Sequence, residues 1–112
     1  MEEKAGEVFS IAKDNMPVPG CTISKEVHGG ENGIIYFSLA KNTDISAEIF
    51  PYHKLLIVAE GSLEVYGTNG YRKVLHAGDS VLTSTDIPIG MKTDTGAVYT
   101  EIEIRRSDIM NE

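Results

Sequence analysis

The chain has 112 residues and a net charge of −7, and these two figures limit the functions it can have. A chain of this length fits one domain, which we place at 1–112, and leaves no room for two. The negative charge repels phosphate backbones and argues against nucleic-acid binding. Hydrophobic residues make up 41% of the sequence, which is enough for a packed core and excludes general disorder.

The sequence gives no sign of a membrane or a secreted setting. Its longest apolar runs, such as Leu55–Ala59, are far too short to span a bilayer. The first four residues, Met-Glu-Glu-Lys, do not resemble a secretory signal. The single cysteine, Cys21, excludes an internal disulfide framework and fits a reducing compartment. We therefore expect a cytoplasmic protein with no membrane partner.

Short β-like runs separated by turn residues dominate the sequence. In chain order, the expected strands are Val8–Ile11, Thr22–Val27, Gly33–Ala40, Ile45–Phe50, Lys54–Ala59, Ser62–Tyr66, Arg72–Leu75, Ser80–Thr83 and Ala97–Ile104. Glycine, proline, asparagine and aspartate fill the breaks between them, as expected for turns. Asn69-Gly70 is a strong hairpin signal. No segment has a sustained 3.6-residue apolar period, so the pattern predicts an all-β sandwich or barrel.

Two segments resemble the two motifs of the cupin superfamily. The first, residues 46–65, is similar to a motif in which an H-x-H pair and a glutamate lead into an apolar strand and a glycine turn. That turn is Glu60-Gly61 here, and we expect Gly61 to need a positive φ. The second, residues 75–90, contains Ala77-Gly78-Asp79 followed by Ile87-Pro88-Ile89, where the family has Ile-Pro-His.

The resemblance covers about residues 34–104 and implies an RmlC-like jelly roll, the cupin double-stranded β-helix, with added N-terminal strands. The N-terminal runs, including Val8-Phe9-Ser10, resemble the leading strands of small bacterial cupins of unassigned role. We therefore expect a single cupin domain.

The resemblance also implies a metal site, and this sequence departs from the family there. The four ligand positions, which hold His or Glu in the family, are occupied by Glu48, Phe50, Lys54 and Ile89. A one-residue shift of the first motif brings Ala47 and Ile49 to the histidine positions, which is no better. An ammonium group repels cations, and phenyl and alkyl groups offer no lone pair. We expect no metal and no other cofactor.

Alternate residues of the first motif point into the barrel in the family, and we take these positions as the candidate ligand site. The candidate residues are Glu48, Phe50, His53, Lys54, Leu56, Ile89 and Met91. Together they would form a mostly apolar cavity with an acid and a base near its mouth, the usual build of a small-ligand pocket. The alternative is that they fill a core, as in many small barrels. His53 itself is open to two interpretations, a turn histidine beside Pro51-Tyr52 or a pocket residue.

The opposite face of the first-motif strand is apolar too. It carries Ile45, Ala47 and Ile49, and a strand that is apolar on both faces needs cover on both. The N-terminal strands or a second subunit could supply that cover. Because cupins commonly pair through such a surface, we expect a homodimer.

Two functions stay open at this point. The first is a metal-free module that binds a small sugar-like or carboxylate-bearing metabolite in the barrel. The alternative is a metal-independent isomerase, epimerase or lyase, with Glu48 and either Lys54 or His53 as proton carriers. The His–Tyr arrangement of metal-free cupin epimerases is not recognisable here. The sequence identifies neither the ligand nor any catalysis.

Overall fold

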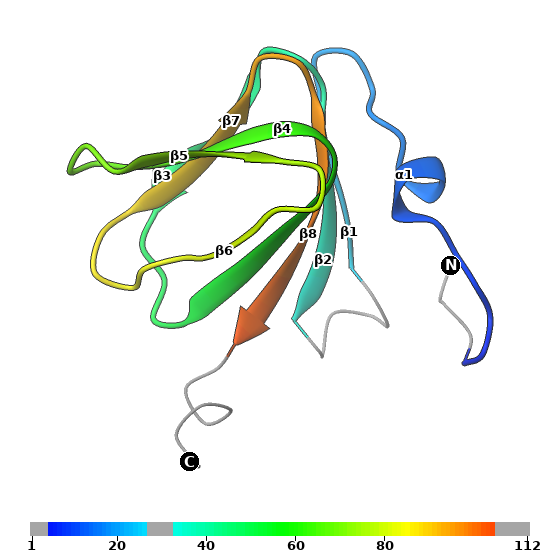
Figure 1. The fold of residues 1–112 in the computed structure, drawn as a ribbon, viewed down its shortest axis with the longest axis horizontal. Coiled ribbons are helices and arrows are strands. Elements are labelled where there is room, and N and C mark those ends of the chain that lie inside the picture. Colours follow the sequence, from blue (N-terminus) through cyan, green and yellow to red (C-terminus); the bar gives the residue numbers. More distant parts are fainter. Residues whose placement is uncertain (1–4, 27–32, 105–112) are drawn as a thin grey trace.

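The computed structural model describes residues 5–26 and 33–104, which form one helical turn and eight strands (Figure 1). The elements are α1 (Ile11–Asp14), β1 (Thr22–Glu26), β2 (Ile34–Leu39), β3 (Thr43–Glu48), β4 (His53–Gly67), β5 (Arg72–His76), β6 (Ser80–Leu82), β7 (Ile89–Thr93) and β8 (Ala97–Ile104). The all-β prediction is confirmed. Within the described ranges, no helix is long and apolar enough to cross a membrane.

Strand β4 organises the sheet. Its first part, up to Gly61, pairs with β8 and β6, and its last part, from Ser62, pairs with β5 and β7. The antiparallel order β1-β2-β8-β4-β7-β3 therefore runs through β4, and the sheet curls over into two facing layers (Figure 1). We call β1, β2, β8, β6 and the start of β4 the first layer, and β3, β7, β5 and the end of β4 the second layer.

The passage of β4 between the layers depends on Gly61. The register with β8 shifts between Val58 and Glu60, and Gly61 has a φ of +76°. A Cβ atom on Gly61 would lie 2.0 Å from the carbonyl oxygen of Gly96, far inside contact distance. The predicted positive φ is confirmed. The strand break expected at Glu60-Gly61 is wrong, because the strand bends there and continues.

The N-terminal segment differs from its prediction. Val8–Ile11 was expected as a strand, but α1 begins at Ile11 and the residues before it are irregular. Ser10 caps this turn, because its hydroxyl accepts from the Lys13 N–H while the Asp14 carboxylate accepts from the Ser10 N–H. The expected end of the next strand, Val27, lies outside the described residues.

This N-terminal segment covers part of the outer face of the first layer. The Phe9 ring lies 5.9 Å from that of Tyr36, measured between centroids. The Asn15 amide donates to the Ser38 hydroxyl at 3.2 Å, and that hydroxyl donates to the Asn15 carbonyl. Tyr36 and Ser38 are consequently buried although they point away from the barrel interior.

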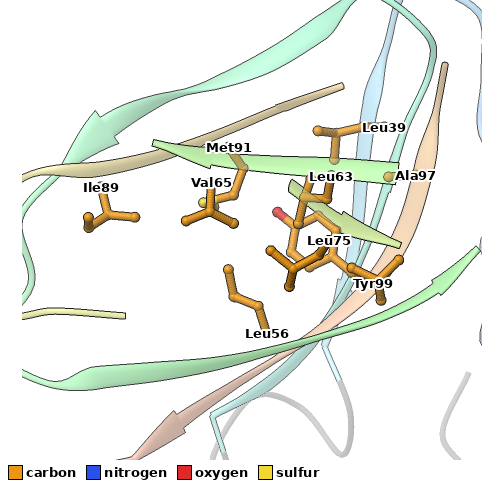
Figure 2. Packing of buried hydrophobic residues seen from close by; sticks show 10 residues of the cluster. Leu39, Leu56, Leu63, Val65, Leu75, Ile89, Met91, Ala97 and Tyr99 are labelled. Carbon is orange, nitrogen blue, oxygen red and sulfur yellow. The ribbon is translucent and has the colours of Figure 1, made fainter. Parts of the chain in front are cut away.

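The hydrophobic core lies between the two layers (Figure 2). Its buried members are Leu39, Leu56, Val58, Leu63, Val65, Leu75, Ile89, Met91, Ala97 and Tyr99. Burying a leucine or valine side chain contributes about 1.5–3 kcal/mol relative to leaving it in water. The Tyr99 hydroxyl also points into this cluster, and it has no hydrogen-bond partner among the described residues.

Candidate functional site

Strand β3 turns both Ile45 and Glu48 towards the inner face because a bulge lies between them. Ile45 pairs with Met91 and Glu48 pairs with Ile89, with a register shift in between. Residues directly opposite each other share a face, and a bulge inserts one residue and so resets the alternation. Ile45 packs against the core, so the expectation that it faces outwards is wrong. Glu48 follows on the same inner face but is exposed at the rim.

Lys54 and Glu101 form an ion pair inside the barrel. The Lys54 Nζ lies 3.4 Å from Glu101 Oε2, and the two side chains are 13% and 4% exposed. Glu101 lies on β8 directly opposite Leu56, a core residue, which places its carboxylate on the inner face. Sequence reasoning proposed Glu48 as the acid beside Lys54 and missed Glu101.

Burial perturbs the acidic groups around this pair. It raises the pKa of Glu101, and the Lys54 ammonium opposes that rise by favouring the carboxylate. Burial also raises the pKa of Tyr99, and the negative charge of Glu101 adds to the effect. The Tyr99 hydroxyl therefore stays protonated. The interior thus holds a cation, an acid that takes up a proton more readily than usual and a neutral hydroxyl.

The connection between β3 and β4 carries two aromatic rings, and one of them, Phe50, covers Lys54. The Phe50 ring centroid lies 3.5 Å from Lys54 Nζ, a cation–π contact. The Tyr52 ring lies 5.5 Å from that of Phe50, and its hydroxyl donates to Glu103 Oε2 at 3.2 Å. The connection itself is irregular, and loops of this kind move more easily than the strands they join.

The cavity at this site is small. It has a volume of about 10 Å³ and is lined by Glu48, Phe50, Tyr52, Lys54, Thr83, Ser84, Ile89 and Met91. Such a volume holds about one water molecule. In this conformation the side chains fill most of the space that the sequence left open as either pocket or core.

Solved structures with the same architecture come from several bacteria. A conserved protein of unknown function from Streptococcus pyogenes matches with a TM-score of 0.84 at 15% identity, covering 94% of this chain and 92% of that one. A cupin superfamily protein from Desulfitobacterium hafniense matches with a TM-score of 0.80 at 12% identity, covering 94% and 97%. An uncharacterised conserved protein with a double-stranded β-helix domain, from Klebsiella pneumoniae, matches with a TM-score of 0.72 at 18% identity, covering 88% and 89%.

The chain has the cupin fold. The predicted double-stranded β-helix is thereby confirmed. No family model matches the sequence, and the search of curated proteins found no significant match. At these identities the likeness shows the fold alone, so the function has to be argued from the residues of this cupin barrel.

The candidate residues are divided among three places in the cupin barrel. Those that line the small cavity are Glu48, Phe50, Lys54, Ile89 and Met91. Leu56 is fully buried in the core. His53 does not line the small cavity; its ring lines a second one, beside Asn69 and Tyr71. Its Nδ1 lies 2.7 Å from the carbonyl oxygen of Thr83.

The residues at the cupin metal positions do not fit a metal ion. Lys54 places an ammonium group there, while Phe50 and Ile89 offer no donor atom. Within residues 5–26 and 33–104, no three His, Cys, Asp or Glu side chains are grouped so that they could hold an ion. The chemistry of this site therefore has to come from protein side chains.

Proposed function

We propose that this cupin binds a small, hydroxyl-rich metabolite of the sugar-like class at its barrel mouth, without a metal. The observation that supports this most strongly is the Lys54–Glu101 pair inside an otherwise apolar barrel. Buried ion pairs seldom stabilise a fold more than apolar side chains of similar volume would. Ionisable groups with perturbed pKa values in a concave site are common at functional sites.

The chemistry of the pair suits a hydroxyl group. The Lys54 ammonium only donates hydrogen bonds and the Glu101 carboxylate only accepts them, whereas a ligand hydroxyl does both. Because the two charges compensate each other, the pair favours an uncharged ligand over an anion. Phe50 and Tyr52 supply the apolar walls that such pockets use beside a few polar groups.

Ligand entry requires the residues between β3 and β4 to move, since the cavity of about 10 Å³ has no room for a metabolite. Moving Phe50 off Lys54 loses one cation–π contact, which is worth about 0.5–2 kcal/mol. Ligand contacts can offset a cost of that size. The proposal is therefore a site that opens when the ligand binds.

A thermal-shift screen with matched neutral sugars and sugar acids tests the proposal, because a ligand that binds only the native state raises the melting temperature. We expect a rise with a neutral sugar that Lys54→Met and Glu101→Gln both abolish. Glu64→Gln is the matched control, since the half-buried Glu64 carboxylate pairs with the 64% exposed Arg72 in the second layer, away from the small cavity. A rise with sugar acids alone would reassign the site to carboxylate-bearing ligands. No rise with either class, in folded protein, would contradict ligand binding.

A metal-independent isomerase, epimerase or lyase is the second candidate, and Glu101 is the residue that favours it. Burial raises the pKa of Glu101, which suits a group that both takes up and releases a proton. Glu48 lies exposed at the rim, so the acid–base pair would be Glu101 with Lys54. Deuterium uptake from D₂O into a C–H bond of the bound sugar, lost in Glu101→Gln, would support catalysis.

We also propose a cytoplasmic homodimer, although not through the surface first expected. Ile45 packs inside, and Ile49 is left 55% exposed by itself. The outer face of the first layer offers a better apolar row, formed by directly paired residues of four strands: Ile34, Ile102, Leu55 and Leu82. Leu82 is 51% exposed. Light scattering of the wild type should give twice the monomer mass. Leu82→Glu should lower the measured mass towards that of the monomer. A wild-type mass of 12.2 kDa would contradict a dimer.

A further inference from the structure

The residue after β6 forms a fixed wall at the barrel mouth. The Thr83 N–H donates to the Lys54 carbonyl at 2.9 Å, and its hydroxyl accepts from the Lys54 N–H at 3.0 Å. Its carbonyl oxygen lies 2.7 Å from Nδ1 of His53. Thr83 is 7% exposed. Because these bonds tie it to two successive residues of β4, Thr83 forms a common wall of the small cavity beside Lys54 and of a second cavity beside His53.

The bond from His53 to Thr83 also determines the tautomer of the histidine. A carbonyl oxygen can only accept, so Nδ1 carries the hydrogen. In the neutral ring Nε2 is then a lone-pair acceptor, and it is the remaining polar atom of the side chain. A ring held in this way presents a hydrogen-bond acceptor of defined orientation.

His53 lines a cavity of about 380 Å³, whose other lining residues are Asn69, Tyr71, Leu82, Thr83, Ser84, Ile87 and Ile89. This volume lies in the usual range for small-molecule sites, about 300–1,000 Å³. Tyr71 and Ile87 pack against the core, which holds those walls in place. The Asn69 side-chain oxygen accepts from the Tyr71 N–H at 3.1 Å, so its NH₂ group is the end left for other contacts.

We propose that this second cavity binds a small, uncharged, ring-shaped molecule carrying one hydroxyl or N–H donor, which His53 Nε2 accepts. The apolar walls favour a ring, and none of the lining residues is an acid, a lysine or an arginine that would pair with a charged ligand. His53 is half-buried, and a ring that covers its acceptor without offering a donor would leave that acceptor unmatched, which is costly. This site is independent of the sugar-like ligand proposed beside Lys54.

The first test uses two probes of matched shape, 4-propylphenol and its methyl ether, titrated into the whole ¹⁵N-labelled protein. We expect the phenol to bind about tenfold more tightly, because the ether lacks the donor. Amide shifts should centre on Asn69, Tyr71 and Ile87. His53→Phe should remove the preference, while His76→Phe, at an exposed histidine, should keep it. Equal affinities, or shifts confined to other regions, would overturn the proposal.

The second test needs no variant and decides the matter even if His53→Phe does not fold. The imidazole ¹⁵N spectrum of the wild-type protein should show the Nδ1–H tautomer for His53. The Nε2 resonance should move when the phenol is added and stay in place with the ether. An Nε2–H tautomer in the free protein, or an Nε2 resonance that ignores the phenol, would contradict the proposed role of His53.

Discussion

The inside of the barrel has two layers of side chains with opposite chemistry, although β4 contributes to both. The deep layer, Leu63, Val65 and Leu75, is apolar and buried. The mouth layer, Lys54, Glu101 and Phe50, joins two charges to an aromatic ring. Removing apolar groups from water favours folding, whereas removing charges from water opposes it. We therefore expect the deep layer to supply most of the stability, and the mouth layer is where we propose that a ligand binds.

The largest effect is expected from a substitution in the deep layer. Leu63 is 0% exposed, so Leu63→Ala leaves a cavity and should lower the free energy of unfolding by about 4 kcal/mol. Urea unfolding measures it. Val74→Ala is the control on β5, where the side chain is 48% exposed, and should cost under about 1 kcal/mol. Equal losses of unfolding free energy in the two variants would mean that Leu63 is not packed in a buried layer.

The next largest effect is expected from removing one partner of the ion pair in the mouth layer. Lys54→Met leaves the Glu101 carboxylate buried without its partner and should cost about 3 kcal/mol at neutral pH. The double variant Lys54→Met/Glu101→Leu should recover most of this loss, because neither charge then remains. A double variant as unstable as the single one would show that the pair does not act as a unit.

A smaller effect is expected from the pH dependence of the Glu101 carboxyl group. Burial raises the pKa of Glu101 in the folded state above its unfolded value, which is about 4.3. Between those two values the folded state holds more protons, so this group's contribution to stability falls as the pH rises. Glu101→Gln removes that dependence, so the variant should gain on the wild type as the pH increases above about 4.

Glu64→Gln is the control for the pH series, because Glu64 should contribute a pH dependence of stability of the opposite sign. The hydrogen bond from Arg72 is the main factor that lowers the pKa of Glu64, so its contribution is lost as the pH falls. Chemical denaturation at a series of pH values measures both variants. A difference between wild type and Glu101→Gln that does not change with pH would contradict the perturbed carboxyl group.

The smallest expected effect is at the rim. Glu48 is exposed, so Glu48→Gln should change the free energy of unfolding by no more than about 0.5 kcal/mol. The same denaturation experiment measures it beside Lys54→Met. A loss as large as that of Lys54→Met would mean that Glu48, and not Glu101 alone, neutralises the ammonium group.

The sequence predicts the deep layer better than the mouth layer. Alternating apolar residues and turn glycines identify most strands, and the predicted Asn69-Gly70 hairpin is confirmed by the pairing of β4 with β5. Local chemistry decides these features. The short α1 turn was missed because it depends on two capping contacts, and β7 was missed because glycine and lysine interrupt its apolar residues.

The mouth layer could not be predicted because it depends on pairing between distant strands. The bulge in β3 changes the direction of Ile45 relative to Glu48, and no residue type marks it. In β8 the glutamates alternate with Ile102 and Ile104, a pattern that usually turns isoleucine inwards. The opposite occurs here, since Glu101 pairs across from Leu56 on the inner face. One signal in the sequence points to this arrangement. The segment of β4 from Leu55 to Val58 is apolar on both faces, so alternation alone does not decide which face of the neighbouring β8 is the inner one.

The many pairings of β4 also determine how the protein comes apart. This strand is hydrogen-bonded to β5, β6, β7 and β8, so neither the first nor the second layer of the sheet can open without disturbing the other. Amide hydrogens along β4 should exchange with solvent only through global opening, whereas those of β1, which pairs with β2 alone among the described strands, should exchange through local fraying. Limited proteolysis is then expected to trim the chain or digest it whole, without leaving a stable half-barrel.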